Sequence, residues 1–63
     1  MPIADEIRTR RKAHHLTQEE LARAAKTTRS HIGLIEIGQR RPSLDLLERL
    51  AVVLDTTVSR LLR

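Results

Sequence analysis

Arginine is the side chain in this sequence with the clearest chemical potential, because ten of the twelve basic residues are arginine. Its planar guanidinium donates paired hydrogen bonds that match phosphate oxygens or the O6 and N7 atoms of guanine. Three arginines lie within the stretch TTRSHIGLIEIGQRRPS, residues 27–43: Arg29 near its start, and Arg40 and Arg41 near its end. These residue types suit binding to a polyanion.

The charge distribution agrees with this interpretation. The formal net charge is +4 at pH 7. Residues 1–41 hold nine basic and five acidic side chains, while residues 42–63 hold three of each. Many small proteins are mildly basic, so the charge needs a surface of suitable shape through which to act.

Three histidines raise the alternative of a metal site. His14 and His15 are neighbours, which on a helix would point about 100° apart, and no carboxylate or thiol completes a ligand set with them and His31. No Ser-His-acid arrangement is recognisable, and a short chain leaves little room for a substrate pocket. We therefore expect no metal, no other cofactor, no small-molecule substrate and no enzymatic activity.

Length and composition limit the architecture. Sixty-three residues fit one small domain, and its core must be aliphatic because the chain contains no Phe, Trp or Tyr. The absence of cysteine excludes disulfides and thiolate ligands. The longest apolar run, residues 50–54, is far shorter than the roughly 20 residues that span a bilayer, and no signal-peptide pattern is present. These features predict a cytoplasmic protein without membrane association.

Cap residues and apolar spacing predict five short helices. Thr17 and Glu20 have the spacing of a capping box, which starts the second helix. Thr28, Ser43 and Thr57 can cap the next three helices. The predicted helices cover about residues 2–13, 18–26, 29–37, 44–54 and 58–62.

The third predicted helix has two different faces. At 100° per residue, one side carries His31, Ile32 and Ile35. The other side carries the small and cationic residues, together with two apolar ones: Arg29, Ser30, Gly33, Leu34 and Ile37. In the fourth helix the expected core stripe is Leu44, Leu47, Leu50, Ala51 and Leu54.

The run LTQEELARAAKTTRSHIGLIEIGQRRPSLDLLERLAVVLDTTVSRLL, residues 16–62, combines a capping box, small residues in the second helix, an Ile-x-x-Ile-Glu register, a Gly38 stop and a Pro-Ser pair. It resembles the helix-turn-helix of phage repressors, their Cro proteins and the xenobiotic-response-element regulators of bacteria. The resemblance implies an all-α, five-helix, lambda-repressor-like DNA-binding domain over residues 1–63. The helix-turn-helix itself would lie at about residues 17–37.

The sequence departs from the family pattern at three helix ends. Glycine is usual in the family where Lys26 stands, and frequent where His15 and Asp55 stand. The resemblance implies that these residues adopt the left-handed conformation, which costs about 1 kcal/mol for a residue with a side chain and least for aspartate. At Lys26 and His15 the alternative is an altered turn.

The resemblance also implies roles for individual residues. The residues placed to read base edges are Arg29, Ser30 and Leu34, with Gly33 allowing close approach of the DNA. The residues placed to contact phosphates are Gln18, Thr28, Arg40 and Arg41. Arg11 and Glu36 match positions that form an ion pair in part of the family.

Simpler roles remain open for the same residues. Arg29 could be a solvated first-turn residue, and Leu34 a core or dimer residue. Gln18 and Thr28 could serve only in helix capping, and the arginines at 40 and 41 could be merely solvated. Five apolar residues could form a contact with a second copy of the chain, or simply be partly buried: Leu46, Val52, Val53, Val58 and Leu62.

We expect a sequence-specific, double-stranded DNA-binding transcriptional regulator, a repressor, that lays the Arg29–Ile37 helix in the major groove. A symmetric homodimer on an inverted-repeat operator would place its half-sites roughly 34–36 Å apart. Such a protein would act in the bacterial or phage-infected cytoplasm, at the nucleoid. The alternative is a protein-interaction module of the same fold, an antitoxin or coactivator-like adaptor whose DNA binding is secondary. Binding of RNA or single strands is disfavoured, because no aromatic ring is available for base stacking.

Overall fold

The computed structural model describes residues 3–62 and contains helices but no strand within that range. The five helices are α1 (Ile3–Ala13), α2 (Gln18–Ala24), α3 (Arg29–Glu36), α4 (Leu44–Val53) and α5 (Val58–Leu61). The predicted all-α fold with five helices is therefore confirmed. The helices end one or two residues earlier than predicted from α2 onwards, and Pro2, the predicted start of the first helix, lies outside the described residues.

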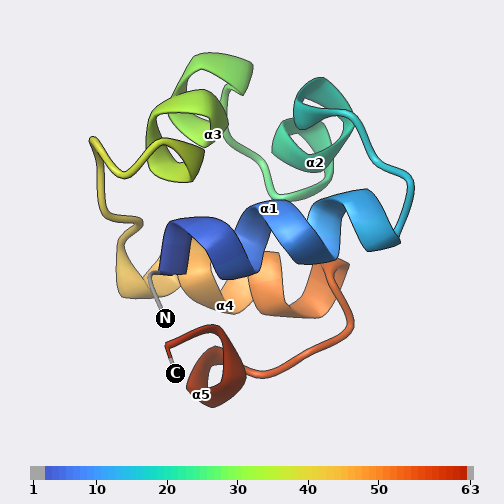
Figure 1. The fold of residues 1–63 in the computed structure, drawn as a ribbon, viewed down its shortest axis with the longest axis vertical. Helices are drawn as coiled ribbons and strands as arrows, with labels where there is room; N and C mark the ends of the chain where they lie inside the picture. The colour runs from blue at the N-terminus through green and yellow to red at the C-terminus, as the bar shows by residue number, and fades with distance from the viewer. Residues whose placement is uncertain (1–2, 63) are drawn as a thin grey trace.

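The helices form a compact arrangement with α2 and α3 at one end (Figure 1). α3 packs against both α2 and α1, while α2 also contacts α4. α5 closes the opposite end by contacting α4 and α1. None of the described helices has the length and apolar character that a membrane crossing requires.

The core is aliphatic, as the composition predicts. Seven large side chains are fully buried, and they come from all five helices and from the C-cap residue that follows α4: Ile7, Leu21, Ile32, Ile35, Leu50, Leu54 and Leu61. Burying one such side chain stabilises the fold by about 1.5–3 kcal/mol. The buried residues of α3 hold that helix against the core by one face only.

Two leucines of α4 lie on the opposite sides from those expected. Leu44 is 64% exposed, whereas Leu46 is only 2% exposed and belongs to the core. The two residues lie 200° apart around the helix, on the two edges of the stripe formed by Leu47, Leu50 and Leu54. The neighbouring helices cover the edge with Leu46, so the expected core position of Leu44 and the expected dimer contact of Leu46 are both wrong.

Polar caps start the helices at the predicted residues. The hydroxyl oxygens of Thr28, Ser43 and Thr57 accept hydrogen bonds from backbone N–H groups three residues further along, at 3.1–3.2 Å. At α2 the Thr17 hydroxyl accepts from the Glu20 N–H at 3.0 Å, and the Thr17 N–H donates to the Glu20 carboxylate at 2.8 Å. The hydrogen bond from the Thr17 backbone, with a smaller contribution from its side chain, lowers the pKa of Glu20 below its ordinary value.

The ends of α1 to α4 share one hydrogen-bond pattern, the Schellman motif. In α2 the Lys26 N–H donates to the Arg23 carbonyl at 3.2 Å, and the Thr27 N–H donates to the Ala22 carbonyl at 2.8 Å. The motif requires a left-handed residue directly after the C-cap, which is the residue that follows the last helical one. The four residues at this position have φ values of 58° (His15), 60° (Lys26), 81° (Gly38) and 53° (Asp55), which confirms the prediction for the three that are not glycine.

Candidate nucleic-acid interface

α3 presents a polar strip to solvent because its other face is fixed in the core. Ile32 and Ile35 are fully buried. On the opposite side Arg29 and Ser30 are exposed, and Leu34 is half-buried. The strip therefore offers a guanidinium, a hydroxyl and the edge of an aliphatic side chain along one accessible helix face.

Gly33 lies in the middle of this strip, and nothing inside the protein requires a glycine there. A Cβ atom built on Gly33 would meet only the Gln18 Oε1 atom, at 3.9 Å, an ordinary van der Waals distance. Glycine inside a helix is less stable than alanine by roughly 0.5–1 kcal/mol. The position thus gives up helix stability without any gain visible in the packing of the chain itself.

Arg11 and Glu36 form a nearly buried ion pair between α1 and the end of α3. The Arg11 Nε atom donates to Glu36 Oε2 at 2.7 Å, and Arg11 Nη2 donates to Glu36 Oε1 at 3.1 Å. The third nitrogen, Nη1, donates to the Leu16 carbonyl at 2.8 Å. Because Glu36 is only 3% exposed, this paired charge holds the end of α3 against α1.

Gln18 joins the same network. Its side-chain Nε2 atom donates to Glu36 Oε1 at 3.1 Å, and the residue is half-buried. The first residue of α2 is thereby tied to the last residue of α3. No sequence spacing predicted this contact, because it depends on how two helices meet.

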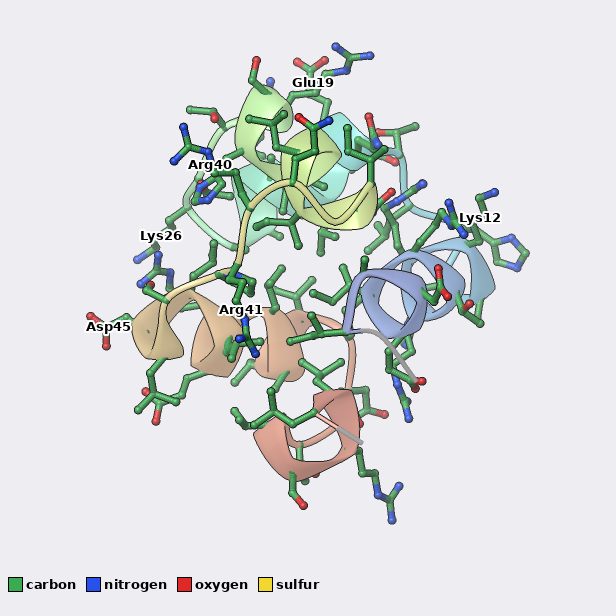
Figure 2. All side chains as sticks on the ribbon, turned by 60° about the vertical axis from the view of Figure 1, so that its left-hand side comes forward. Lys12, Glu19, Lys26, Arg40, Arg41 and Asp45 are labelled. Carbon is green, nitrogen blue, oxygen red and sulfur yellow. The ribbon has the colours of Figure 1, made fainter. Side chains whose placement is uncertain are left out.

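The loop between α3 and α4 carries an exposed basic pair, Arg40 and Arg41. Figure 2 brings this loop forward and labels both side chains on it. Among residues 3–62, neither of them nor Arg29 forms a salt bridge, so their charges are not compensated locally. Pro42 follows them and is buried, which anchors the end of the loop.

The turn between α2 and α3 is also fixed by a side chain from α4. The Nε atom of Arg49, on α4, donates to the Ala25 carbonyl at 2.8 Å. The positive charge of Arg49 also interacts favourably with the negative end of the α2 dipole. Arg49 could not be identified from the sequence, because its spacing from α2 along the chain is not informative.

The residues expected at a dimer contact do not form one exposed group. Val53 and Val58 are half-buried and pack against the core, and Leu46 belongs to it. Leu62 is 53% exposed. The most exposed large apolar side chain of the described residues is Val52, another residue of this expected contact, at 79%.

Two controller proteins are similar to this chain. The control protein C.SmaI of Serratia marcescens is 37% identical over 60 residues, which cover 95% of this chain and 71% of C.SmaI. The restriction-modification controller protein C.AhdI of Aeromonas hydrophila is 37% identical with a TM-score of 0.90, over 95% of this chain and 91% of C.AhdI.

SinR, described as a master regulator for biofilm formation, has a similar structure in its complex with DNA. That match has 33% identity and a TM-score of 0.89, over 94% of this chain and 95% of the SinR chain. A chain of the SinR–SinI complex matches with 34% identity and a TM-score of 0.91, and there this chain spans 59% of its relative's length.

Over the matched regions, the all-α fold of this chain is that of SinR and C.AhdI. A family model described as helix-turn-helix matches residues 7–61, which include α2, α3 and the turn between them. The resemblance to the phage repressor and xenobiotic-response-element regulators is thereby confirmed, and the chain belongs to the helix-turn-helix family.

Proposed function

We propose that this protein is a transcriptional regulator that binds double-stranded DNA in a sequence-specific manner, with α3 in the major groove. The observation that carries the proposal is the division of α3 into a buried face, Ile32 and Ile35, and an exposed face that begins with Arg29 and Ser30. A helix of this kind, packed against a second short helix across a tight turn, fits the width of the major groove. The similarity to SinR, solved in complex with DNA, supports it.

Four residues of α3 would meet the base edges. Arg29 can donate to guanine O6 and N7, and Ser30 can bond to several bases. Leu34 can contact only the methyl group of thymine. Gly33 would let the helix backbone approach the DNA closely.

Four other residues would contact phosphates and set the position of α3. The Thr28 hydroxyl accepts a hydrogen bond with its oxygen and keeps its hydrogen for a phosphate. The Gln18 side chain donates to Glu36, so this residue would contact a phosphate through its backbone N–H. That N–H is free because it lies in the first turn of α2. Arg40 and Arg41 would add two charges that release counterions when they bind.

We propose further that the protein acts as a repressor, as a symmetric homodimer on an inverted-repeat operator. Residues 1–63 would form one DNA-binding domain without enzymatic activity. The relatives named as controllers of restriction-modification and as a master regulator support a regulatory role. A regulator of this kind acts where the DNA is, in the cytoplasm of a bacterium or of a phage-infected cell.

Selection of bound sequences from random duplex DNA, followed by affinity measurement over a range of salt concentrations, tests the proposal. Arg41→Ala should weaken binding to all sequences and reduce the salt slope by about one unit. Arg29→Ala should relax the preference at one base pair, by about 1–3 kcal/mol. Arg60→Ala removes the same charge from an exposed position of α5, at the end of the molecule opposite α2 and α3, and is the matched control.

Two results would contradict the proposal. Absence of any selected motif together with a weak salt slope would favour a protein-interaction module of the same fold. An unchanged base preference in Arg29→Ala would remove this residue from the reading surface.

A further inference from the structure

An open hollow of about 460 Å³ lies between α2 and the start of α3. Its lining residues come from both helices and the turn between them: Glu19, Ala22, Arg23, Thr27, Arg29 and Ser30. The hollow thus adjoins the first two residues of α3, which the proposed function places at the base edges. Glu19 is the one acidic residue in this lining, and Figure 2 shows it at the same end of the molecule as α3.

Glu19 has no structural task comparable to those of the other two glutamates on α2 and α3. Glu20 completes the capping box, and Glu36 is buried in its pair with Arg11. The Glu19 carboxylate lies 3.7 Å from Arg23, and both side chains are largely exposed, 66% and 83%. An exposed ion pair at this distance restrains a side chain only weakly, so the Glu19 carboxylate is free to accept a hydrogen bond from another group.

A free carboxylate on a DNA-facing surface has few favourable partners. Phosphate oxygens only accept hydrogen bonds, so a carboxylate beside them is repelled. In the major groove the amino groups of cytosine and adenine donate, but adenine also presents its N7 acceptor, which repels a carboxylate. Cytosine presents the N4 donor there and is therefore the base that a glutamate side chain favours.

We propose that Glu19 is a specificity-determining residue, whose carboxylate accepts a hydrogen bond from the N4 amino group of a cytosine next to the base pair read by Arg29. This inference rests on the proposed function, because it assumes that the start of α3 lies in the major groove. It adds a reading position on α2 to those on α3. Glu19 also lowers the affinity for an operator that brings a phosphate or another hydrogen-bond acceptor to the hollow, because the carboxylate repels it.

Selection from random duplex DNA with the wild type and Glu19→Gln tests the inference. The wild-type motif should contain a cytosine beside the guanine that Arg29→Ala ceases to select. In Glu19→Gln the preference for that cytosine over adenine should fall by about fivefold or more, because glutamine pairs with the N6 and N7 atoms of adenine. Helix content and thermal stability of the variant should remain close to those of the wild type, since Glu19 is exposed.

Two controls separate base reading from general electrostatics. Glu48→Gln removes the same charge from an exposed position of α4 and should strengthen binding to all duplexes alike, with an unchanged motif. Arg23→Gln breaks the same 3.7 Å pair but keeps Glu19, so it should retain the cytosine preference.

If Glu19→Gln keeps the wild-type motif and only binds all DNA more tightly, the carboxylate acts through charge and the inference is wrong. A wild-type motif without a cytosine at that place overturns it as well. In both cases the existence of a selected motif still supports the proposed function, whereas its complete absence refutes both.

Discussion

Replacing Gly33 with alanine should make the free protein more stable and its complex with DNA weaker. Alanine is better than glycine inside a helix by roughly 0.5–1 kcal/mol. The new methyl group meets no obstacle in the protein, since its nearest neighbour, the Gln18 Oε1 atom, is 3.9 Å away. In a domain of this size 1 kcal/mol corresponds to a shift in Tm of about 4–8 °C, so the variant should melt about 2–8 °C higher.

The expected loss in the DNA complex has a different origin. If DNA packs against the Gly33 backbone, an added methyl group has to push into a close-packed contact, which costs about 1–3 kcal/mol. The dissociation constant for the selected duplex should therefore rise roughly fivefold to over a hundredfold. Fluorescence anisotropy with labelled duplex DNA measures this change, and differential scanning calorimetry measures the stability.

The expected rise in stability and the expected loss of DNA affinity together make the test strict. Gly38→Ala is the matched control, because Gly38 has a φ of 81° and alanine there should lower the stability by about 1 kcal/mol. Unchanged DNA affinity in Gly33→Ala, at increased stability, would show that no close approach occurs at this residue. Decreased stability would refute the assumption that the glycine is free of packing constraints within the protein.

Contacts within the fold lead to three more expectations. A double-mutant cycle of Arg11→Met and Glu36→Gln in urea unfolding should give a coupling free energy of about 1–3 kcal/mol, since the pair is nearly buried; a value near zero would mean that the pair does not stabilise the fold. Lys26→Gly should raise the free energy of unfolding by about 1 kcal/mol, because Lys26 has a φ of 60°; thermal denaturation without a rise would contradict this strain. The lowered pKa of Glu20 means that its contribution to stability is present above the unfolded-state pKa and is lost as the pH falls through the folded-state pKa. Glu20→Gln should thus be less stable than the wild type at neutral pH but equal in acid, whereas a constant difference across the pH range would exclude this linkage.

The parts of the fold that depend on neighbouring residues in the chain were predictable from sequence. Thr17 and Thr28 cap helices through hydrogen bonds that span three residues, so the spacing is sufficient to identify them. The left-handed helix ends at His15 and Lys26 follow from the family pattern, in which glycine is usual or frequent at these positions.

The parts that depend on tertiary packing were not predictable in the same way. Leu44 and Leu46 are equally apolar, and only the position of the surrounding helices decides which of them is buried. Arg49 reaches the Ala25 carbonyl across 24 residues of chain, a contact for which no periodic pattern exists. Glu19 was missed because acidic residues in the first turn of a helix already have a simple explanation in the helix dipole.

The hydrogen bond from Arg49 to the end of α2 has a consequence for the duplex. Together with the bonds among Arg11, Gln18 and Glu36, it ties the end of α2 and the end of α3 to the rest of the molecule. α2 and α3 can then change their mutual angle only by breaking partly buried polar contacts, such as the one between Gln18 and Glu36. Adjustment on binding is left to the DNA, so bendable base-pair steps that no side chain touches should also affect which operators are occupied.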